Sequence, residues 1–184
     1  MVELNFEPFP NLQTGRLVLR KVSMDDAEAL FELRTNDDAM KYINKTKPQS
    51  IAEVYELLEK MTDVSARIQW AVTLKQEPKL IGTIGYHIID RVHYRAEIGY
   101  MLHPAHWNKG LMSEAISSVI DFGFKQMGLH SIEARINPEN MQSGNILKKH
   151  AFIKEGYFKE SYFYNDAFYD SEIYSLLGNA GKKI

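Results

Sequence analysis

The chain has 184 residues, of which 45% are hydrophobic and 25% are charged, with a formal net charge of −2 at pH 7. This balance gives no electrostatic reason to expect nucleic acid or an anionic membrane as a partner, and no apolar run reaches the roughly 18–20 residues that span a bilayer. The chain contains no cysteine, which excludes disulfides, cysteine-ligated metal and a cysteine nucleophile.

The length predicts one domain over residues 1–184, with an N-terminal extension over about residues 1–14. The first residues, MVELNFEPFPNLQ, carry acidic side chains and lack the apolar run of a signal peptide. We therefore expect a cytoplasmic protein.

The first part of the chain predicts a strand followed by two helices. Alternating apolar residues in RLVLRKV indicate a strand over residues 16–22. Ser23 or Asp25 then caps the amphipathic helix MDDAEALFELRTN. A second helix begins at Ser50, which forms a capping box with the glutamate three residues later, and ends near Ser65.

The rest of the chain continues this alternation of strands and helices. In order, the pattern predicts three strands (69–75, 80–90 and 92–102), a helix (113 to about 127), a strand (131–136), a helix (140–151) and two strands (152–164 and 169–177). The order β-α-α-β-β-β-α-β-α-β-β is typical of a mixed α/β domain. Its sheet would be partly antiparallel and contain one strand–helix–strand crossover.

The junction HPAHWNKGLMSEAI joins a strand that ends at Leu102 to a helix that begins near Gly110–Ser113. The first turn of a helix has unpaired N–H groups and a positive dipole end, which suit a diphosphate. Gly110 would let the backbone approach phosphate oxygens, Lys109 could add a charge and Ser113 a hydroxyl. The alternative is a plain strand-to-helix turn with a solvated lysine.

Polar residues cluster again at the end of the next strand and the start of the next helix. These are Asn137, Asn140, Ser143 and Asn145. Asn140 can simply cap that helix. A polar strand end beside a helix N-terminus that suits phosphate also predicts a long ligand that lies across the strand end and the helix.

Five segments covering nearly the whole chain form a specific combination. They are LQTGRLVLRKVSMDDAEALFEL, LIGTIGYHI, AEIGYMLHPAHWNKGLMSEAI, NPENMQSGNILKKHAFIKEG and NDAFYDSEIYSLL. Together they resemble the GNAT superfamily of acetyl-CoA-dependent N-acetyltransferases and, within it, the RimJ/RimL type that acetylates ribosomal-protein N-termini. The resemblance implies an α/β (α+β) fold with a mixed, mostly antiparallel central sheet whose middle strands splay apart, flanked by helices. It also implies acetyl-CoA as co-substrate and a homodimer.

The phosphate-binding loop of that superfamily reads Gln/Arg-x-x-Gly-x-Gly/Ala. Trp107, Gly110 and Met112 occupy its key places here. Asn108 and Met112 stand where small residues are usual, so we expect a bulkier loop around the diphosphate. Ala151 likewise replaces a glycine that is usual in the family.

The resemblance further implies that the strand EIGYML splays from its neighbour SIEARIN, and that the pantetheine arm of the coenzyme lies in the gap. The arm would pair with backbone groups of Met101 and Leu102. A backbone N–H there would polarise the thioester carbonyl, where negative charge develops. The residues expected to bind acetyl-CoA are Met101, Leu102, Trp107, Asn108, Lys109, Gly110, Leu111, Met112, Ser113, Asn137, Asn140 and Ser143.

We expect Glu97 to be the general base that accepts the proton of the amine. It lies four residues before Met101, and a carboxylate of raised pKa there can act directly or through water. The alternative is a surface or hydrogen-bonded strand glutamate. RimL-type enzymes resemble this chain over residues 156–165, and their proposed basic glutamate falls on Tyr162 here. Glu160 would share a strand face with that residue and is a further candidate.

Many superfamily members protonate the leaving thiolate with a tyrosine on the last helix, but Leu147 occupies that place here. The RimL-like Asn-x-x-Ser pattern falls on Asn140 and Ser143, so the resemblance assigns the acid to Ser143. The alternative is an ordinary serine in a helical turn. His150 is the other titratable residue of this helix, where solvation or a contact with the helix dipole is the simpler explanation.

Without a cysteine to carry the acetyl group, a cysteine acyl-enzyme is impossible, so we expect direct attack by the amine in a ternary complex. Residues 36–49 and 159–170 are the expected walls of the acceptor cleft. The aromatic residues of the second segment are Tyr162, Phe163, Tyr164, Phe168 and Tyr169. They can pack in the core, frame an extended peptide or contact a dimer partner.

Three functions remain open on this sequence. The first is an acetyltransferase acting on the N-terminal α-amine of a ribosomal or other protein. The second acts on a small amine such as a polyamine, an aminoglycoside or another metabolite, and the third is a non-catalytic acyl-CoA sensor. Excess acidic residues in the cleft would favour a polycation. His87, His93 and His103 do not show ligand spacing, so we expect no metal.

Overall fold

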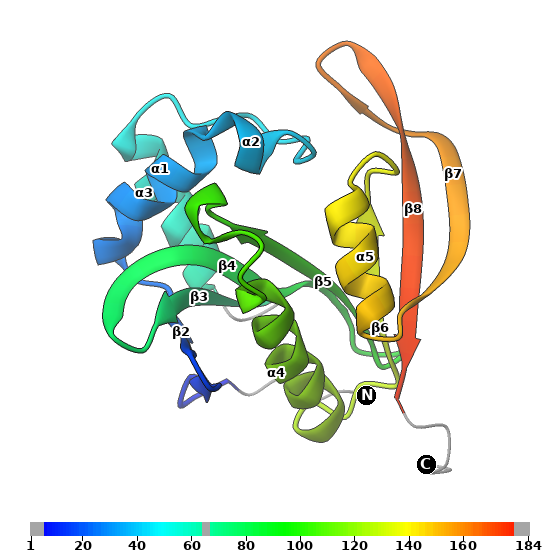
Figure 1. The fold of residues 1–184 in the computed structure, drawn as a ribbon, viewed down its shortest axis with the longest axis horizontal. Coiled ribbons are helices and arrows are strands. Elements are labelled where there is room, and N and C mark those ends of the chain that lie inside the picture. The colour runs from blue at the N-terminus through cyan, green and yellow to red at the C-terminus, as the bar shows by residue number, and fades with distance from the viewer. Residues whose placement is uncertain (1–5, 64–66, 179–184) are drawn as a thin grey trace.

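Eight strands form a mixed sheet at the centre of the fold (Figure 1). They are β1 (Leu12–Gln13), β2 (Leu17–Lys21), β3 (Ile68–Leu74), β4 (Glu77–Asp90), β5 (Arg95–Leu102), β6 (Ser131–Ile136), β7 (Ile153–Tyr164) and β8 (Ala167–Leu177). Their order in the sheet is β1-β2-β3-β4-β5-β6-β8-β7, and every neighbouring pair is antiparallel except β5 and β6. This computed structural model describes residues 6–63 and 67–178.

Helices cover both faces of the sheet. They are α1 (Ala27–Thr35), α2 (Asp37–Met40), α3 (Ile51–Thr62), α4 (Leu111–Lys125) and α5 (Met141–Lys149). One core, which contains Trp70, Ile84 and Ile116, packs under α4 and α5. The other, which contains Leu30 and Leu58, packs under α1 and α3. Figure 1 shows α4 beside α5, with α1, α2 and α3 gathered apart from them.

β5 and β6 pair over three residues only, Arg95–Glu97 against Ser131–Glu133. Beyond these residues the strands part, while β5 stays paired with β4 as far as Leu102 and β6 stays paired with β8 as far as Ile136. The predicted sheet, mostly antiparallel and splayed in the middle, is therefore confirmed. Where β5 and β6 separate, the backbone groups of β5 that face the gap have no strand partner.

The predicted order of elements is confirmed, with β1 and α2 as additions. β1 pairs with β2 and brings the end of the expected N-terminal extension into the sheet. α2 begins because Asn36 Oδ1 accepts a hydrogen bond from the Ala39 amide at 3.0 Å, which starts a new helical turn directly after α1.

Several helix boundaries differ from the prediction by a residue or two. Ser23 rather than Asp25 is the N-cap of the first helical segment, which begins as a 3-10 turn before α1. α3 ends at Thr62, and the expected end near Ser65 lies outside the described residues. α4 begins two residues earlier than predicted because Gly110, and not a later residue, is its N-cap.

The β7–β8 hairpin turns on two residues instead of the expected four. Asn165 and Asp166 have φ values of 46° and 56°, a pair of left-handed residues that matches the twist of a two-residue hairpin. β8 therefore starts at Ala167. In the described part of the chain, no helix is long and apolar enough to cross a membrane.

Candidate active site

The turn that joins β5 to α4 carries most of the residues predicted to bind the coenzyme. It contains a 3-10 turn (Pro104–His106) and two residues of positive φ, Asn108 at 58° and Gly110 at 72°. Gly110 is the N-cap of α4, so no side chain caps this helix, and the Gly110 carbonyl accepts from the Glu114 amide at 3.1 Å. The amides of residues 111–113 thus have no partner within the helix and lie at its positive dipole end.

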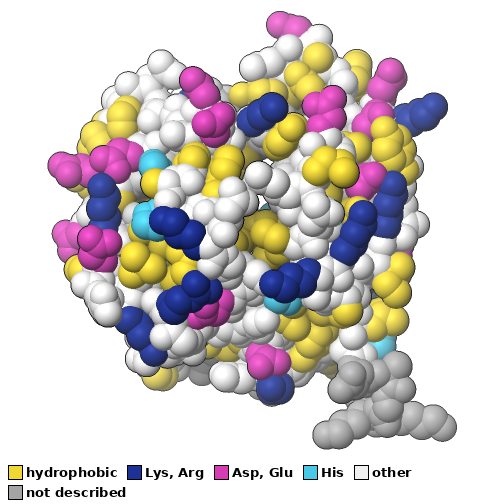
Figure 2. All heavy atoms as spheres, viewed as in Figure 1, with side chains coloured by type: hydrophobic (Ala, Val, Ile, Leu, Met, Phe, Trp, Pro, Cys, Tyr) yellow, Lys and Arg dark blue, Asp and Glu magenta, His cyan; other side chains and the backbone are white. Residues whose placement is uncertain are grey.

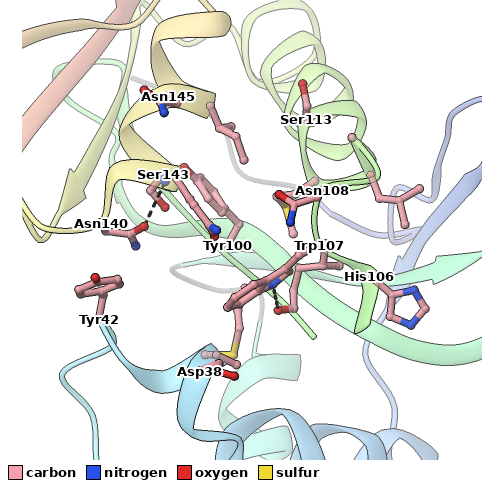
Figure 3. Close-up of a pocket in the computed structure, with 18 of the residues that line it drawn as sticks. Asp38, Tyr42, Tyr100, His106, Trp107, Asn108, Ser113, Asn140, Ser143 and Asn145 are labelled. Atoms are coloured by element: carbon pink, nitrogen blue, oxygen red, sulfur yellow. Dashed lines mark hydrogen bonds between the residues drawn. The ribbon is translucent and has the colours of Figure 1, made fainter. Parts of the chain in front are cut away.

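A cavity of about 390 Å³ opens in front of this turn, between α2, the turn itself and α5 (Figure 3). All the residues predicted to bind the coenzyme line it except Lys109 and Asn137. The lining residues that were not predicted include Asp38, Tyr42, Tyr100, His106 and Lys149. Figure 2 shows this face of the molecule hollowed near its centre. The turn therefore leaves room for a ligand, although Asn108 and Met112 are bulkier than the usual residues.

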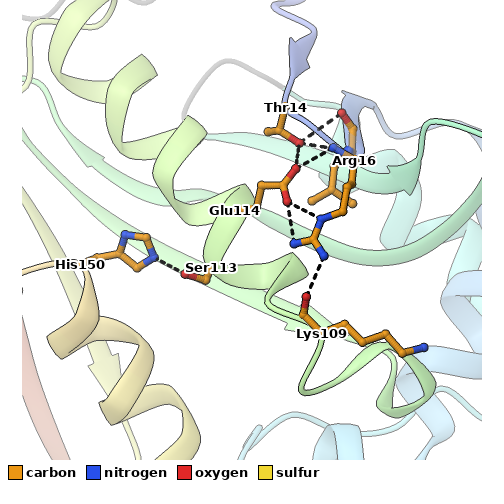
Figure 4. Close-up of polar contacts among 7 residues, drawn as sticks. Thr14, Arg16, Lys109, Ser113, Glu114 and His150 are labelled. Atoms are coloured by element: carbon orange, nitrogen blue, oxygen red, sulfur yellow. Dashed lines mark hydrogen bonds and ion pairs between the residues drawn. The ribbon is translucent and has the colours of Figure 1, made fainter.

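Lys109 does not line this cavity, and Figure 4 shows its contact with Arg16. Its ammonium group donates to the Ala105 carbonyl at 2.8 Å, and its own carbonyl accepts from Arg16 Nη1 at 2.9 Å. Arg16 Nε also donates to Glu114 Oε2 at 2.8 Å, and the Thr14 hydroxyl donates to the same carboxylate. Thr14 and Arg16, in the link between β1 and β2, thus hold the turn against α4. No local sequence pattern indicates this contact, because Arg16 and Lys109 are far apart in the chain.

The end of β5 is locked to the same turn. Trp107 Nε1 donates to the Leu102 carbonyl at 2.7 Å, and the His103 amide donates to β4 at 2.8 Å. Because backbone groups alternate in direction along a strand, those of Met101 also face β4, whereas those of Tyr100 and Leu102 face the gap. The Leu102 amide, and not the Met101 amide, therefore points into the gap between β5 and β6.

A second cavity, of about 660 Å³, adjoins the first. The residues that line both are Tyr42, Ile43, Tyr100, Met101, Asn140 and Ser143. Asn137, predicted to bind the coenzyme, lines only the second cavity. The two segments expected to border the acceptor contribute to its wall, through residues 42–45 and through Tyr162.

Glu97 lines the second cavity, where its Oε1 lies 3.1 Å from Nε2 of His87. Burial alone would raise the pKa of this carboxyl group. The hydrogen bond with His87 and the charges of His87 and Arg135 outweigh burial, so the pKa lies below its ordinary value. The expectation of a raised pKa for Glu97 is therefore wrong. Glu160 is exposed and lines neither cavity.

Tyr100 lines both cavities, and its hydroxyl is buried and has no hydrogen-bond partner of good geometry among the described residues. Ser143 lies next to it in Figure 3. Burial raises the pKa of Tyr100 to about 12, against a smaller lowering effect of Ser143. Sequence reasoning missed Tyr100 because it looked for a tyrosine on the last helix. The available signal was a phenol next to Met101 in the splayed strand, where a buried hydroxyl needs a partner.

α5 carries Ser143 to the junction of the cavities. The Ser143 amide donates to Asn140 Oδ1 at 3.1 Å, so Asn140 caps this helix. Leu147, at the place of the superfamily tyrosine, is fully buried in the core. His150 lines neither cavity; its Nε2 lies 2.9 Å from the Ser113 hydroxyl, and burial lowers its pKa. No cluster of three or more His, Asp or Glu side chains suited to a metal occurs among residues 6–63 and 67–178.

The first cavity fits coenzyme A by the groups that it offers. Uncapped amides at a helix N-terminus bind phosphate, and Gly110 places no side chain between the backbone and such a ligand. The parted strands admit a linear arm, and the second cavity is lined by the ionisable carboxylate of Glu97 and by Tyr100. This fold and this pair of cavities define an acyl-CoA-dependent transferase.

Similarity to known proteins identifies the family of this chain. Residues 16–153 match the family described as Acetyltransferase (GNAT) domain, so the chain belongs to the GNAT acetyltransferases and uses acetyl-CoA as co-substrate. The protein named as the uncharacterized N-acetyltransferase YoaA of Bacillus subtilis (strain 168) is 36% identical over 172 residues. The match spans 92% of this chain and 97% of YoaA.

Solved structures agree with this assignment. The GNAT-family acetyltransferase from Bacillus anthracis has a TM-score of 0.82 at 32% identity, over 91% of this chain and 98% of that chain. Spermidine N-acetyltransferase from Vibrio cholerae, in complex with CoA and spermine, has a TM-score of 0.78 at 27% identity, over 88% and 95%. RimL, a ribosomal L7/L12 α-N-protein acetyltransferase in complex with CoA, shares the fold alone, with a TM-score of 0.81 at 17% identity over 91% and 98%. The GNAT resemblance is confirmed, and the RimJ/RimL type is not established by these likenesses.

Proposed function

We propose that this acetyltransferase moves the acetyl group to a primary amine by direct attack in a ternary complex. The observation that carries the proposal is the meeting of the two cavities at Tyr100, Met101 and Ser143. One cavity suits the coenzyme, and the other has room and a carboxylate for an amine. The chain has no cysteine that could hold the acetyl group between the two substrates.

Acetyl-CoA supplies the activated acyl group as a thioester. The amides of residues 111–113 would hold its diphosphate, with Asn108 and Lys149 on the same cavity wall. The Leu102 amide faces the gap and is the N–H that would polarise the thioester carbonyl. Asn140 and Asn137, on the opposite side of the gap, would orient the arm of the coenzyme.

Two side chains of β5 would handle the protons. An attacking amine must be neutral, and we assign the general base to Glu97, which acts directly, through His87 or through water. For the acid, Tyr100 joins Ser143 as a candidate, because its hydroxyl is protonated at neutral pH and the residue lines both cavities.

The first candidate acceptor is the N-terminal α-amine of a protein, including a ribosomal protein. A small amine is the second, since Spermidine N(1)-acetyltransferase of Vibrio cholerae is 27% identical over 141 residues, 77% of this chain and 81% of that protein. The lining of the second cavity opposes a polycation, because it contains Arg34, Lys45, Lys60, Arg67 and Arg135. We therefore place the α-amine first.

Thiol release from acetyl-CoA with a library of N-terminal peptides, compared with a polyamine panel, tests this function. Initial-rate lines at several fixed acceptor concentrations should intersect, as expected for a ternary complex. Parallel lines together with an isolated acetylated enzyme would contradict direct attack. Tight acetyl-CoA binding without thiol release on any amine would leave the sensor as the remaining function.

We further propose that the chain forms one domain, that it works in the cytoplasm and that it is a homodimer. The exposed apolar side chains of the β7–β8 hairpin support the dimer. Neither nucleic acid nor a membrane is required by the charge balance of the chain.

A further inference from the structure

The second cavity is basic, although the whole chain has a net charge of −2. The cationic or titratable nitrogen side chains among its lining residues are Arg34, Lys45, Lys60, Arg67, His87 and Arg135. Glu97 is the one carboxylate among the described lining residues, and His87 and Arg135 already act on it. The rest of the cavity therefore has positive charge without a matching carboxylate in its wall.

Two hydrogen-bond donors in this wall are buried and unsatisfied. Arg34, in the last turn of α1, has its Nε buried without a partner among the described residues, and the same holds for Nδ2 of Asn44. Burial also lowers the pKa of Arg34. A buried donor without an acceptor is unfavourable, and more so when it is charged. Both groups therefore call for an acceptor that the described chain does not supply.

Lys45 adds a cation close to Arg34. Neither residue forms an ion pair with a carboxylate in the described part of the chain. The pKa of Lys45 is lowered by burial and by the positive charges of Arg34 and Arg67. Arg34 is half-buried and Lys45 is exposed. Like charges held close together repel one another, and an anion placed among them would relieve that repulsion.

We infer that the acceptor carries, besides its amine, an anionic group of the carboxylate or phosphate type, bound by Arg34, Asn44 and Lys45. The inference rests on the proposed function for the amine, which would lie toward Glu97 and His87 in the same cavity. A guanidinium group matches two oxygens of a carboxylate or phosphate, and the amide and ammonium groups supply further donors. A polyamine would bring charge of the wrong sign to this wall.

Two sources carry this chemistry. A free amino acid or amino phosphate joins an amine and an anion within one small molecule. A protein N-terminus followed by acidic side chains presents the same pair of groups on a peptide. The test therefore compares both sources, each against a partner that differs only in charge.

Thiol release from acetyl-CoA is measured with O-phosphoethanolamine against ethanolamine, β-alanine against propylamine, and a peptide with glutamates at its second and third positions against the same peptide with glutamines. Spermidine is the polycation arm. The anionic member of at least one pair should have a kcat/KM at least about tenfold higher. The double variant Arg34→Met/Lys45→Met should reduce this preference to about twofold or less, as expected when the charge partners are removed.

The matched control is Lys79→Met, which removes an exposed lysine that pairs with Glu32 and lines neither cavity. It should keep the full preference. A higher kcat/KM for the neutral members or for spermidine would overturn the inference. So would a preference that survives in the Arg34→Met/Lys45→Met variant.

A binding measurement separates this inference from the proposed function. Inorganic phosphate is added to the protein saturated with CoA, so that the α4 turn is already occupied, with sodium chloride of equal ionic strength as reference. The melting temperature should rise by about 2 °C or more in the wild type and not in Arg34→Met/Lys45→Met. A rise that both proteins share, or none in either, would count against the anion site. If the phosphate-induced rise in melting temperature depends on Arg34 and Lys45 but no amine releases thiol, the proposed function is wrong and the anion site is still supported. If amines react without regard to their charge, the function stands and the inference fails.

Discussion

Glu97 and Tyr100 lie three residues apart on β5, so the alternation of a strand turns them to opposite faces. They differ in charge state for a physical reason. His87 and Arg135 keep the pKa of Glu97 low in spite of burial, whereas burial without a charged partner raises the pKa of Tyr100 to about 12. At neutral pH Glu97 is therefore ionised and Tyr100 is protonated, which are the states in which they can accept and donate a proton.

Replacing Glu97 by Gln should reduce turnover at neutral pH by about 10²–10⁴-fold, the usual effect of removing a general base. The Kd of acetyl-CoA should be unchanged, because Glu97 lines only the second cavity. Steady-state kinetics and calorimetry measure the two quantities. Glu160→Gln, an exposed glutamate outside both cavities, is the matched control. Unchanged turnover or an unchanged pH–rate profile in Glu97→Gln, or an equal loss in both variants, would remove Glu97 from the role.

The lowered pKa of Glu97 also predicts an effect on acid stability. A carboxyl group with a lowered pKa in the folded state stabilises the fold above its ordinary pKa of 4.5, and this stabilisation is lost as the pH falls through the lowered value. Glu97→Gln should therefore lose less melting temperature than the wild type between about pH 5 and pH 3. Thermal melts across that range check this, and parallel curves for the two proteins would disprove it.

Tyr100→Phe removes the hydroxyl and leaves the ring. If Tyr100 donates the proton, turnover should fall by about 10²-fold or more, a typical loss for a general acid. The melting temperature should stay the same or rise, because a buried hydroxyl without a partner is lost. Ser143→Ala, measured beside it, shows which of the two hydroxyls matters. Normal turnover in Tyr100→Phe with a loss in Ser143→Ala would return the acid to Ser143.

At the scale of elements, the start of α4 depends on a strand from the other end of the chain. Arg16, the residue before β2, donates to the Lys109 carbonyl and to Glu114, so the start of β2 helps to position the turn that faces the first cavity. The helix itself was predictable from its apolar spacing, because that signal is local. Its span was predicted to start two residues late, at Ser113, because a glycine cap at φ 72° leaves no hydroxyl or carboxylate signature in the sequence.

Gly110→Ala tests the turn against a matched glycine. Gly110 and Gly128 both have a left-handed backbone, with φ of 72° and 69°, so alanine at either position should cost about 1–2 kcal/mol of stability. Only Gly110 faces the coenzyme cavity. Calorimetry with CoA should show an affinity at least about tenfold weaker for Gly110→Ala, because its backbone would no longer approach the diphosphate closely. Equal affinity in Gly110→Ala and Gly128→Ala would contradict the diphosphate site.

At the scale of the whole molecule, net charge proved a poor guide to the acceptor. The total of −2 averages over a surface on which acidic side chains lie mostly outside the second cavity, while Arg34, Lys45, Lys60, Arg67 and Arg135 converge within it. These residues come from α1, the segment that follows α2, α3, the approach to β3, and β6. Their convergence is a consequence of topology, since no two of them share a local motif.

The sheet also ends in an exposed strand that favours association. β7 is the outermost strand, and Phe163 and Phe168 of its hairpin are 58% and 62% exposed, with ring centroids 5.0 Å apart. An unpaired edge beside exposed aromatics is typical of a surface that pairs with another chain. We therefore expect a dimer in solution by light scattering.

The double variant Phe163→Ser/Phe168→Ser should shift that dimer to a monomer. Val92→Ser, which changes a residue of similar exposure (62%) on the β4–β5 turn, should leave it intact. A monomeric wild type, or a dimer that survives in the double variant, would refute this use of the hairpin.

The sequence by itself determined the local features of this protein: the order of its strands and helices, the glycine turn before α4, the cap at Asn140 and the resemblance to the GNAT superfamily. Each of these features depends on residues close together in the sequence, through apolar periodicity, capping chemistry or a contiguous motif. The tertiary structure alone decided the lowered pKa of Glu97, the burial of the Tyr100 hydroxyl, the anchoring of the turn by Arg16 and the basic wall of the second cavity. Burial and long-range electrostatics set these properties, and both depend on which distant segments the fold brings together.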